Sequence, residues 1–401
     1  MTVDIWWLLL IPAMFGLGWL ARGLDGRDPA RDDALPGAYF KGLNFLLNEQ
    51  PDKAIDAFVD VVRIQPETIE LHFALGSLFR RRGETERAIR VHQNLVERGD
   101  LSADQREHAL FELGQDYLKA GLLDRAEDAF NRLEGSQYRA AALGHRLRIA
   151  QMVRDWATAI SIAEQLDRDP AEPQHLEIAH FHCELAEGLA NGQPGEGSRD
   201  AVAPDLTAAR EALARAIKVN DRHPRAWLMR GRFALAQGDA PGAIAALRAA
   251  FERDPRVAAL AATDWLAAHE LAGTREQGIA ELDAIQQAHP SVDVLAAIES
   301  SVRAHQGDAA GAAYLEAALR RAPSLLGYRQ LLERRLAAGV NGDALAEIEL
   351  AQQLIKRQAE RLSRFVCGQC GFSARKYYWH CPGCNAWDSY SPRRAEELER
   401  S

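Results

Sequence analysis

Hydrophobic and small residues recur along most of this chain in a pattern that predicts pairs of antiparallel helices. Between Ala38 and Pro66, two amphipathic segments of helical period are joined by a short polar turn. A second copy follows. Its first glycine, Gly76, lies 34 residues after Gly42, the corresponding glycine of the first copy. Small residues let the two helices of a pair approach closely, and large ones fill the gap to the next pair. The further landmarks are Phe45, Ala54 and Phe58, then Phe79, Gly83 and Ala88.

Further copies extend this pattern over residues 35–340. A third copy is displaced by extra residues around 99–108, and the cleanest copy begins near Trp227. Weaker copies are traced at 140–166, 178–219, 265–290 and 305–319, so we expect about seven to eight helical pairs. A glycine-rich stretch at 191–204 predicts a flexible insertion in one pair. The landmarks of the third copy are Gly114, Tyr117, Gly121, Ala126 and Phe130, and those of the later one are Gly231, Gly238, Ala243, Leu247, Ala250 and Pro255.

The spacing of these landmarks resembles the tetratricopeptide repeat. The resemblance implies an all-α superhelix whose inner surface binds segments of other proteins, with the first helix of each pair lining the groove. For "FRRRGE" at 79–84, the plainer interpretation is a helix end whose cations stabilise the helix dipole. The residues that the resemblance places in a partner-binding groove are Phe73, Ser77, Arg80, Gln115, Lys119 and Arg232.

The chain begins with an uncharged apolar segment that predicts a membrane anchor at residues 1–21. From Ile5 to Ala21 there are 17 residues without a charge, long enough for a short transmembrane helix. A cleaved signal peptide and a buried helix are the alternatives, but no basic residue precedes the segment and no typical cleavage site ends it. Arg22, Arg27 and Arg31 follow it, in a linker at 22–34, so the positive-inside rule places the rest of the chain in the cytoplasm.

Composition and charge narrow the class of protein. The 401 residues are 47% hydrophobic and 26% charged, which suits a folded chain. The net charge of −9 is spread along the length, so no basic surface for nucleic acid is expected. Five cysteines are too few for a disulfide scaffold in a chain of this length. The sequence therefore excludes a nucleic-acid partner and indicates a reducing compartment.

Four of the five cysteines form two C-x2-C pairs within residues 365–390. Cys367 and Cys370 are separated from Cys381 and Cys384 by ten residues, a spacing typical of a tetrahedral four-thiolate site for zinc or a single iron. His380 adjoins a ligand and is a weaker alternative. Around the cysteines, six aromatic residues are expected to form a small core, and metal binding is expected to supply much of the folding free energy. These are Phe372, Tyr377, Tyr378, Trp379, Trp387 and Tyr390.

The two pairs, C-G-Q-C-G-F and C-P-G-C, resemble the metal-binding knuckles of rubredoxin. In rubredoxins a glycine follows the second cysteine, and Gly371 takes that place in the first knuckle. The second knuckle has Asn385, a departure, although asparagine tolerates a positive φ better than most residues. The resemblance favours one iron ion as the cofactor, with zinc as the alternative.

The rest of the chain contains a predicted terminal helix, a short tail and one further cluster of possible metal ligands. A helical pattern at 341–364 predicts a terminal helix that could hold the metal module against the repeats, and residues 391–401 form a tail. No catalytic motif stands out, so we expect a protein that is not an enzyme. "HFHCE" is the only other cluster of metal-binding residue types, but His180 and His182 point to different sides of a helix, which favours ordinary packing.

The order of an anchor, a tetratricopeptide array and a rubredoxin-like tail resembles the lipopolysaccharide assembly protein B family over the entire chain. "FLLNEQPDKAIDAF" at 45–58 and "YYWHCPGCNAWDSY" at 377–390 are the most characteristic stretches. The resemblance implies a single-pass protein of the cell inner membrane with its bulk in the cytoplasm. It further implies an adaptor that promotes degradation of the lipid A deacetylase by a membrane AAA protease, alongside other lipopolysaccharide assembly proteins. The alternatives are an electron-transfer partner and a general scaffold for envelope complexes.

Overall fold

The computed structural model is almost entirely helical and describes most of the chain. The described residues are 40–42, 44–45, 47–48, 50–64, 68–167, 174–192, 203–339 and 343–399. The expected anchor at 1–21 and linker at 22–34 lie outside these residues, as does most of the insertion at 191–204. Among the described residues, no helix has the length and apolar character that crossing a membrane requires.

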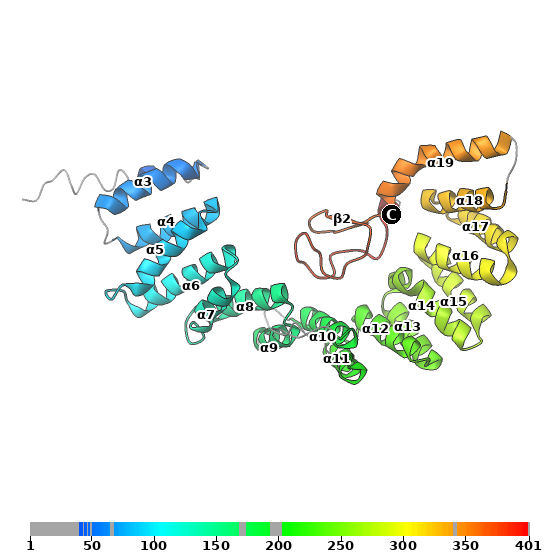
Figure 1. The fold of residues 1–401 in the computed structure, drawn as a ribbon, viewed down its shortest axis with the longest axis horizontal. Coiled ribbons are helices and arrows are strands. Elements are labelled where there is room, and N and C mark those ends of the chain that lie inside the picture. The colour runs from blue at the N-terminus through cyan, green and yellow to red at the C-terminus, as the bar shows by residue number, and fades with distance from the viewer. Residues whose placement is uncertain are drawn as a thin grey trace, which may run out of the picture. The chain divides into compact units, whose positions relative to one another are not determined.

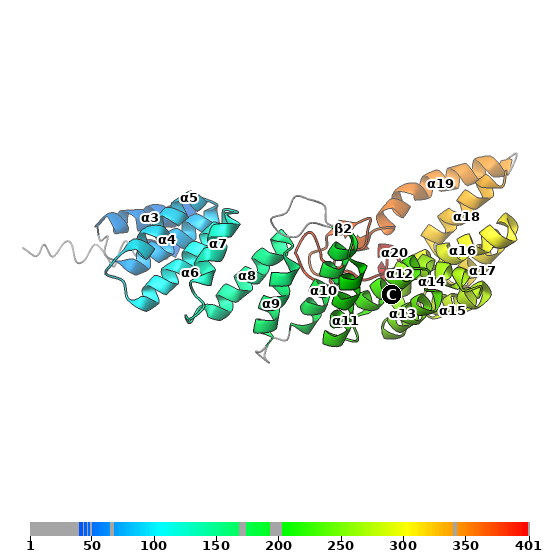
Figure 2. The same ribbon diagram turned by 60° about the horizontal axis from the view of Figure 1, so that its bottom comes forward.

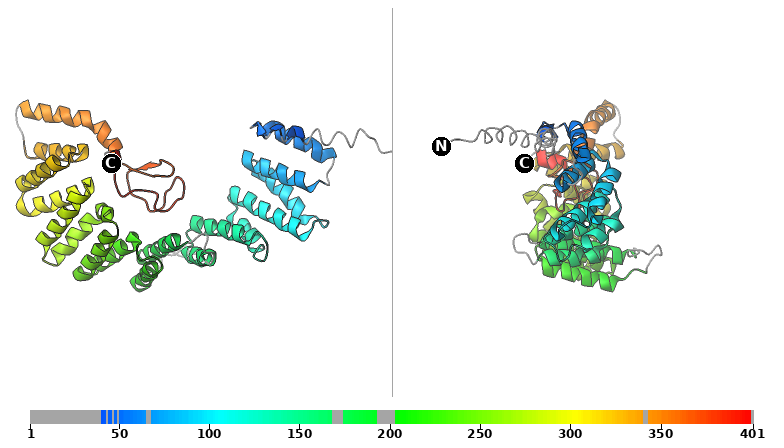
Figure 3. Two further views of the ribbon diagram at one scale, coloured as in Figure 1. Left: turned by 180° about the vertical axis from the view of Figure 1, so that it is seen from behind. Right: turned by 90° about the vertical axis from the view of Figure 1, so that its left-hand side faces the viewer.

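The chain divides into two compact units, Met1–Ile149 and Ala150–Ser401. In the first unit, successive helices stack as antiparallel pairs (Figure 3). The helices of the first unit are α3 (Pro51–Ile64), α4 (Ile69–Arg82), α5 (Thr85–Glu97), α6 (Ala103–Lys119), α7 (Leu123–Asn131) and α8 (Arg139–Val153). The last turn of α8 lies beyond the boundary at Ile149.

Small residues at the helix crossings hold each pair together, as the repeat pattern predicts. A Cβ atom at Gly76 would lie 2.4 Å from His92 Nε2, and one at Gly114 would lie 2.7 Å from Phe130 Cε1. These glycines therefore allow the first helix of a pair to lie against a large side chain of the second helix. The turn between α4 and α5 needs a glycine for another reason, because Gly83 has φ 87°.

Polar side chains fix where several helices begin. Ser102 Oγ accepts the Gln105 N–H while the Gln105 side chain accepts the Ser102 N–H, which forms a capping box at the start of α6. In the second unit, Asp155 and Asp239 accept backbone N–H groups at the starts of α9 (Trp156–Leu166) and α13 (Ala240–Arg253). These local signals explain why the helix pairs can be read from the sequence.

The second unit consists of further helix pairs, which end with α19 and are followed by the cysteine module (Figure 1). Its largest core lies between α12 and α16 and includes Trp265, which is 1% exposed and donates Nε1–H to Gly278 O at 2.9 Å. Among the described residues, the first unit has the pairs α4–α5 and α6–α7, and the second unit has five pairs in succession from α10–α11 to α18–α19. The helices of the second unit are α9 (Trp156–Leu166), α10 (His175–Ala190), α11 (Leu206–Val219), α12 (Pro224–Ala236), α13 (Ala240–Arg253), a 3-10 turn η1 (Pro255–Val257), α14 (Ala258–Leu271), α15 (Arg275–Ala288), α16 (Val292–Gln306), α17 (Asp308–Arg321), α18 (Leu325–Ala337) and α19 (Asp343–Leu362).

The chain then turns back on itself, so that the cysteine module lies beside the repeats of its own unit (Figures 1 and 2). The predicted terminal helix is α19, and the module that follows has two short antiparallel strands, β1 (Phe365–Val366) and β2 (Ser373–Ala374). The segment 391–401, expected only as a tail, contains a short helix, α20 (Ala395–Glu399). Arg394 pairs with Asp293 of α16 at 2.6 Å, so this segment is fixed to the repeats.

Candidate functional site

The four cysteines of the module converge on one point. Their sulfur atoms all lie within 4.8 Å of one another. Cys367 Sγ lies 3.8 Å from Cys384 Sγ, and Cys370 Sγ lies 3.7 Å from Cys381 Sγ. A tetrahedral ion with metal–sulfur bonds of about 2.3 Å places its sulfurs about 3.8 Å apart. The residues present therefore fit one zinc or iron ion.

Each C-x2-C pair forms the same backbone turn. Gly371 N–H donates to Cys367 O at 3.0 Å, and Asn385 N–H donates to Cys381 O at 2.8 Å. Both donors have positive φ, 73° for Gly371 and 59° for Asn385. Asparagine thus adopts the backbone conformation that glycine takes in the other knuckle, as its tolerance of the left-handed region predicts. The departure from the rubredoxin pattern at Asn385 does not change the shape of the turn.

Hydrogen bonds favour the thiolate form, which a metal ion requires, at two of the four cysteines. A hydrogen bond from Ser389, with backbone N–H groups of Gln369 and Cys370, lowers the pKa of the Cys367 thiol to about 6. Gly383 N–H donates to Cys381 Sγ at 3.4 Å, and the pKa of that thiol is lowered as well. Burial and bonds with the neighbouring cysteines instead raise the pKa of the Cys370 and Cys384 thiols, so a bound cation must displace their protons.

The aromatic core of the module is smaller than the sequence predicts. Tyr390 is 3% exposed and packs with Phe365 and the buried cysteines, and Tyr377 lies against this cluster. Phe372 and Tyr378 are instead 43% and 39% exposed, so their expected place in the core is wrong. About 25 residues enclose too little volume for six aromatic rings, and the metal site takes part of that volume.

Trp379 and Trp387 face the repeats instead. The Trp387 ring stacks on His180 of α10 with centroids 4.5 Å apart and meets Phe181 edge-on at 5.8 Å. The Trp379 ring lies 5.8 Å from the Arg225 guanidinium at the start of α12. Aromatic contacts therefore hold the module on α10 and α12 of the repeats.

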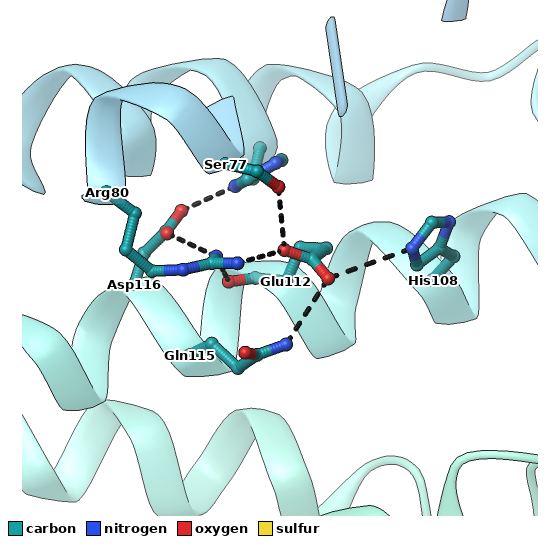
Figure 4. Close-up of polar contacts among 7 residues, drawn as sticks. Ser77, Arg80, His108, Glu112, Gln115 and Asp116 are labelled. Carbon is teal, nitrogen blue, oxygen red and sulfur yellow. Dashed lines mark hydrogen bonds and ion pairs between the residues drawn. The ribbon is translucent and has the colours of Figure 1, made fainter. Parts of the chain in front are cut away.

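The residues predicted to line a partner groove are partly brought together in the first unit (Figure 4). Arg80 of α4 pairs with Glu112 at 2.6 Å and with Asp116 at 2.7 Å, both on α6 of the next repeat. Ser77 Oγ donates to Glu112 Oε2 at 3.3 Å, and Gln115 Nε2 donates to Glu112 Oε1 at 3.3 Å. Glu112 is therefore the centre of a network that joins two repeats.

The buried side of this network contains a histidine–aspartate pair that the sequence did not indicate. Asp116 is fully buried, and its Oδ2 lies 2.5 Å from His92 Nδ1. The fully buried carboxylate of Asp116 is tolerated because Arg80 and His92 both form hydrogen bonds with it. The main contacts of Arg80 are therefore ion pairs that join α4 to α6 of the next repeat. Stabilisation of the α4 dipole is secondary to these ion pairs.

The other three groove candidates are arranged differently. Phe73 stacks on His108 of α6 with ring centroids 4.1 Å apart, while Lys119 is exposed in the last turn of α6. Arg232 lies in the second unit, where its Nε donates to Asp264 Oδ2 at 2.8 Å. Arg80–Glu112 and Arg232–Asp264 are each 32 residues apart. The same arginine–carboxylate bond therefore joins successive repeats in both units.

Comparisons with known proteins identify both the cysteine module and the helical repeats. Residues 365–392 match a family model described as a rubredoxin metal binding domain, and residues 203–258 match a tetratricopeptide repeat. Lipopolysaccharide assembly protein B of Escherichia coli K12 is 32% identical over 389 residues, which cover 96% of this chain and 97% of that protein. The protein of the same name from Haemophilus influenzae is 27% identical, covering 97% of this chain and 98% of that protein. The first model carries the name of a zinc ribbon, which suggests zinc and not the iron favoured from sequence.

Proposed function

Because the chain belongs to the lipopolysaccharide assembly protein B family, we propose that it regulates lipopolysaccharide synthesis as an adaptor for proteolysis. In this proposal it brings the lipid A deacetylase to a membrane AAA protease and so shortens the lifetime of the deacetylase. The observation that carries the proposal is the 32% identity over 96% of the chain, which includes both the repeats and the cysteine module. A repeat array and the names of the relatives suggest a binding protein and not an enzyme.

The proposed location is the cell inner membrane, with residues 1–21 as a single anchor and the remaining chain in the cytoplasm. Arginines after the apolar segment and their absence before it support this orientation. An anchor confines the adaptor to the plane of the protease, which raises the effective concentration of both partners. Weak contacts along the repeats can then suffice for delivery.

The repeat array supplies the surface for these contacts. Phe73, Ser77 and Arg80 lie on one helix beside the Glu112 network, where each is partly exposed. Arg232 and Lys119 offer exposed cations at equivalent first helices. A partner segment with carboxylates could exchange a bond with Arg232 at little cost, because its ion pair with Asp264 is largely exposed and such pairs contribute little stability. Arg80 is bonded to the buried Asp116 and would keep that bond.

The proposed role of the metal ion is structural, and zinc is the ion that the name of the family model suggests. The knuckle backbone and sulfur spacing suit zinc and iron equally, because both ions form four-thiolate sites of this size. Elemental analysis of the full chain, purified without added metal, tests the choice. Iron with a reversible redox couple would instead support the electron-transfer alternative.

The deciding experiment measures the lifetime of the lipid A deacetylase after protein synthesis is stopped. Cells depleted of this protein are complemented with the intact chain, a chain lacking residues 1–21, or Cys367→Ser. Cys183→Ala is the matched control, because Cys183 is a buried cysteine of α10 outside the metal site. We expect depletion to lengthen the lifetime, and only the intact chain and Cys183→Ala to restore it. An unchanged lifetime on depletion would contradict the proposal and leave the scaffold alternative.

A further inference from the structure

A second cluster of metal-binding side chains lies where the cysteine module meets the repeats. His180 Nε2 of α10 lies 3.2 Å from His223 Nε2 and 3.1 Å from Asp388 Oδ1. His223 immediately precedes α12, and Asp388 belongs to the module. The three ligand atoms lie within 4.8 Å of one another. Three segments far apart in the sequence therefore bring two imidazoles and one carboxylate to a single point.

We propose that His180, His223 and Asp388 bind a second divalent ion of the zinc class, which fixes the cysteine module on the repeats. Two nitrogen ligands at about 2.0–2.1 Å from a tetrahedral ion lie about 3.3 Å apart, close to the observed 3.2 Å. Two histidines and a carboxylate are a known ligand set for zinc, with a fourth position left for water. The carboxylate of Asp388 is partly exposed, so an ion can enter from that side.

The protonation state of the histidines suits this role. Metal ions bind neutral imidazole, and protonation competes with them. Burial lowers the pKa of His223 to about 3 and the pKa of His180 well below its usual value. Both side chains are therefore neutral at neutral pH. Burial also raises the pKa of Asp388, and a bound cation would compensate the lost solvation of that carboxylate.

The surrounding charges allow an added cation. Arg225 is the nearest guanidinium, and it pairs with Glu184 at 2.7 Å and Glu187 at 3.3 Å. Asp388 is bonded to His180 and not to this arginine. Arg154 lines the same hollow, so the three carboxylates of Asp388, Glu184 and Glu187 exceed the two guanidiniums by one charge. A divalent ion is attracted to that excess of negative charge.

Two local adjustments accompany binding. The rings of His180 and His223 are perpendicular with centroids 4.3 Å apart, and a shared ion would separate them to about 5 Å. Arg225 Nη1 lies 3.4 Å from His180 Nδ1, which carries the proton once Nε2 binds the ion. The guanidinium must then move towards Glu184 and Glu187, to which it is already bonded. The backbone supports the position of the carboxylate, because Asp388 N–H donates to Trp379 O at 2.9 Å.

A metal count on the full chain in detergent tests the proposal. The protein is saturated with Zn²⁺, dialysed and analysed for zinc, and we expect about two ions per chain, one in each site. His223→Gln and Asp388→Asn should each lower the count to about one and weaken the second site at least about tenfold. His182→Gln is the matched control, because His182 lies on the same helix outside the cluster. It should keep both ions.

Cobalt gives a readout that does not depend on the variants folding. Filling the second site of the wild-type chain with Co²⁺, after zinc occupies the cysteines, should add d–d absorption without a sulfur-to-cobalt charge-transfer band. One zinc per wild-type chain and no such absorption would overturn the proposal. Two ions retained in both His223→Gln and Asp388→Asn would overturn it as well, because the second ion would then lie elsewhere.

Discussion

At the scale of single residues, an added methyl group distinguishes two kinds of glycine in the first unit. Gly114 lies in α6 against Phe130, where a Cβ would come within 2.7 Å of the ring. Gly144 lies in α8, and a Cβ there would meet nothing within 4 Å. The first glycine is kept for packing, whereas the second only raises the backbone entropy of the unfolded chain. Sequence periodicity identified Gly114 as a landmark, because its contact is within one helix pair.

Gly114→Ala should therefore lower the free energy of unfolding of the first unit by about 1–3 kcal/mol, the usual cost of overpacking. Gly144→Ala should leave it unchanged or raise it by up to about 1 kcal/mol, since alanine favours a helix. Urea titrations of the full chain, followed by hydrogen exchange in peptides of α6 and α7, measure both effects. Equal effects of the two substitutions would show that the crossing at Gly114 is loose.

At the scale of elements, the short helix α20 caps two helices of the repeat array. Glu396 accepts backbone N–H groups of Leu325 and Leu326 at the start of α18, the second at 3.1 Å. Glu397 accepts Val292 N–H at the start of α16 at 2.8 Å. A carboxylate at a helix N-terminus satisfies free N–H groups and interacts with the dipole. No local sequence pattern predicts these caps, because both partners lie 70 residues or more away.

Glu396→Gln should lower the stability of the C-terminal end of the array by about 1–3 kcal/mol, because one of two accepting oxygens is replaced by a donor. Glu399→Gln is the matched control. Within the described part of the chain, Glu399 pairs with Arg361 at 3.0 Å, and both side chains are more than half exposed, so the loss of this pair should cost little. Hydrogen exchange at the first turn of α18 reports the effect. Unchanged exchange in Glu396→Gln would mean that α20 does not cap α18 in solution.

The contact between α10 and the module should make stability depend on pH. Burial lowers the pKa of His223 to about 3 and the pKa of His180 well below 6.5, whereas unfolded histidines titrate near 6.5. The unfolded chain therefore binds more protons below pH 6.5, and the stability from these histidines falls as the pH drops from 6.5 towards 3. Asp388 acts in the opposite direction, because burial raises its pKa. Arg225 and the partly buried His380 also face His180, and both disfavour its protonation.

We expect the urea midpoint of the second unit to fall between pH 7.5 and pH 5, with a slope of up to about 1.4 kcal/mol per pH unit for each histidine. His223→Gln should flatten the slope. A cation bound to the same nitrogens would act with the same sign, because protons displace it. A midpoint that rises on acidification would show that protonation of Asp388, and not of the histidines, determines the pH dependence of stability.

At the scale of the whole molecule, what the sequence could predict depends on how local each signal is. The clearer helix pairs, the four converging cysteines and the knuckle turns follow from spacings of a few residues, and the structure has them. The weak copy traced at 305–319 is instead little more than the single helix α17. The junction of His180 with His223 and Asp388 depends on how the repeats curve and where the module docks, which no short pattern encodes. For the same reason, the sequence pattern predicts Trp379 and Trp387 in the core of the module, whereas they contact the repeats.

Metal removal should therefore affect more than the module. Without an ion at the four cysteines, a segment with so small a core should unfold, and the contacts of Trp387 with His180 and Phe181 would be lost. Chelation should then increase hydrogen exchange in α10 and in the first turn of α12, while α4 to α7 belong to the other unit and should keep their protection. Cys183→Ala, treated in the same way, should behave like the wild type. If α10 keeps its protection although the module exchanges freely, the repeats are stable by themselves, and the module depends on them without supporting them in return.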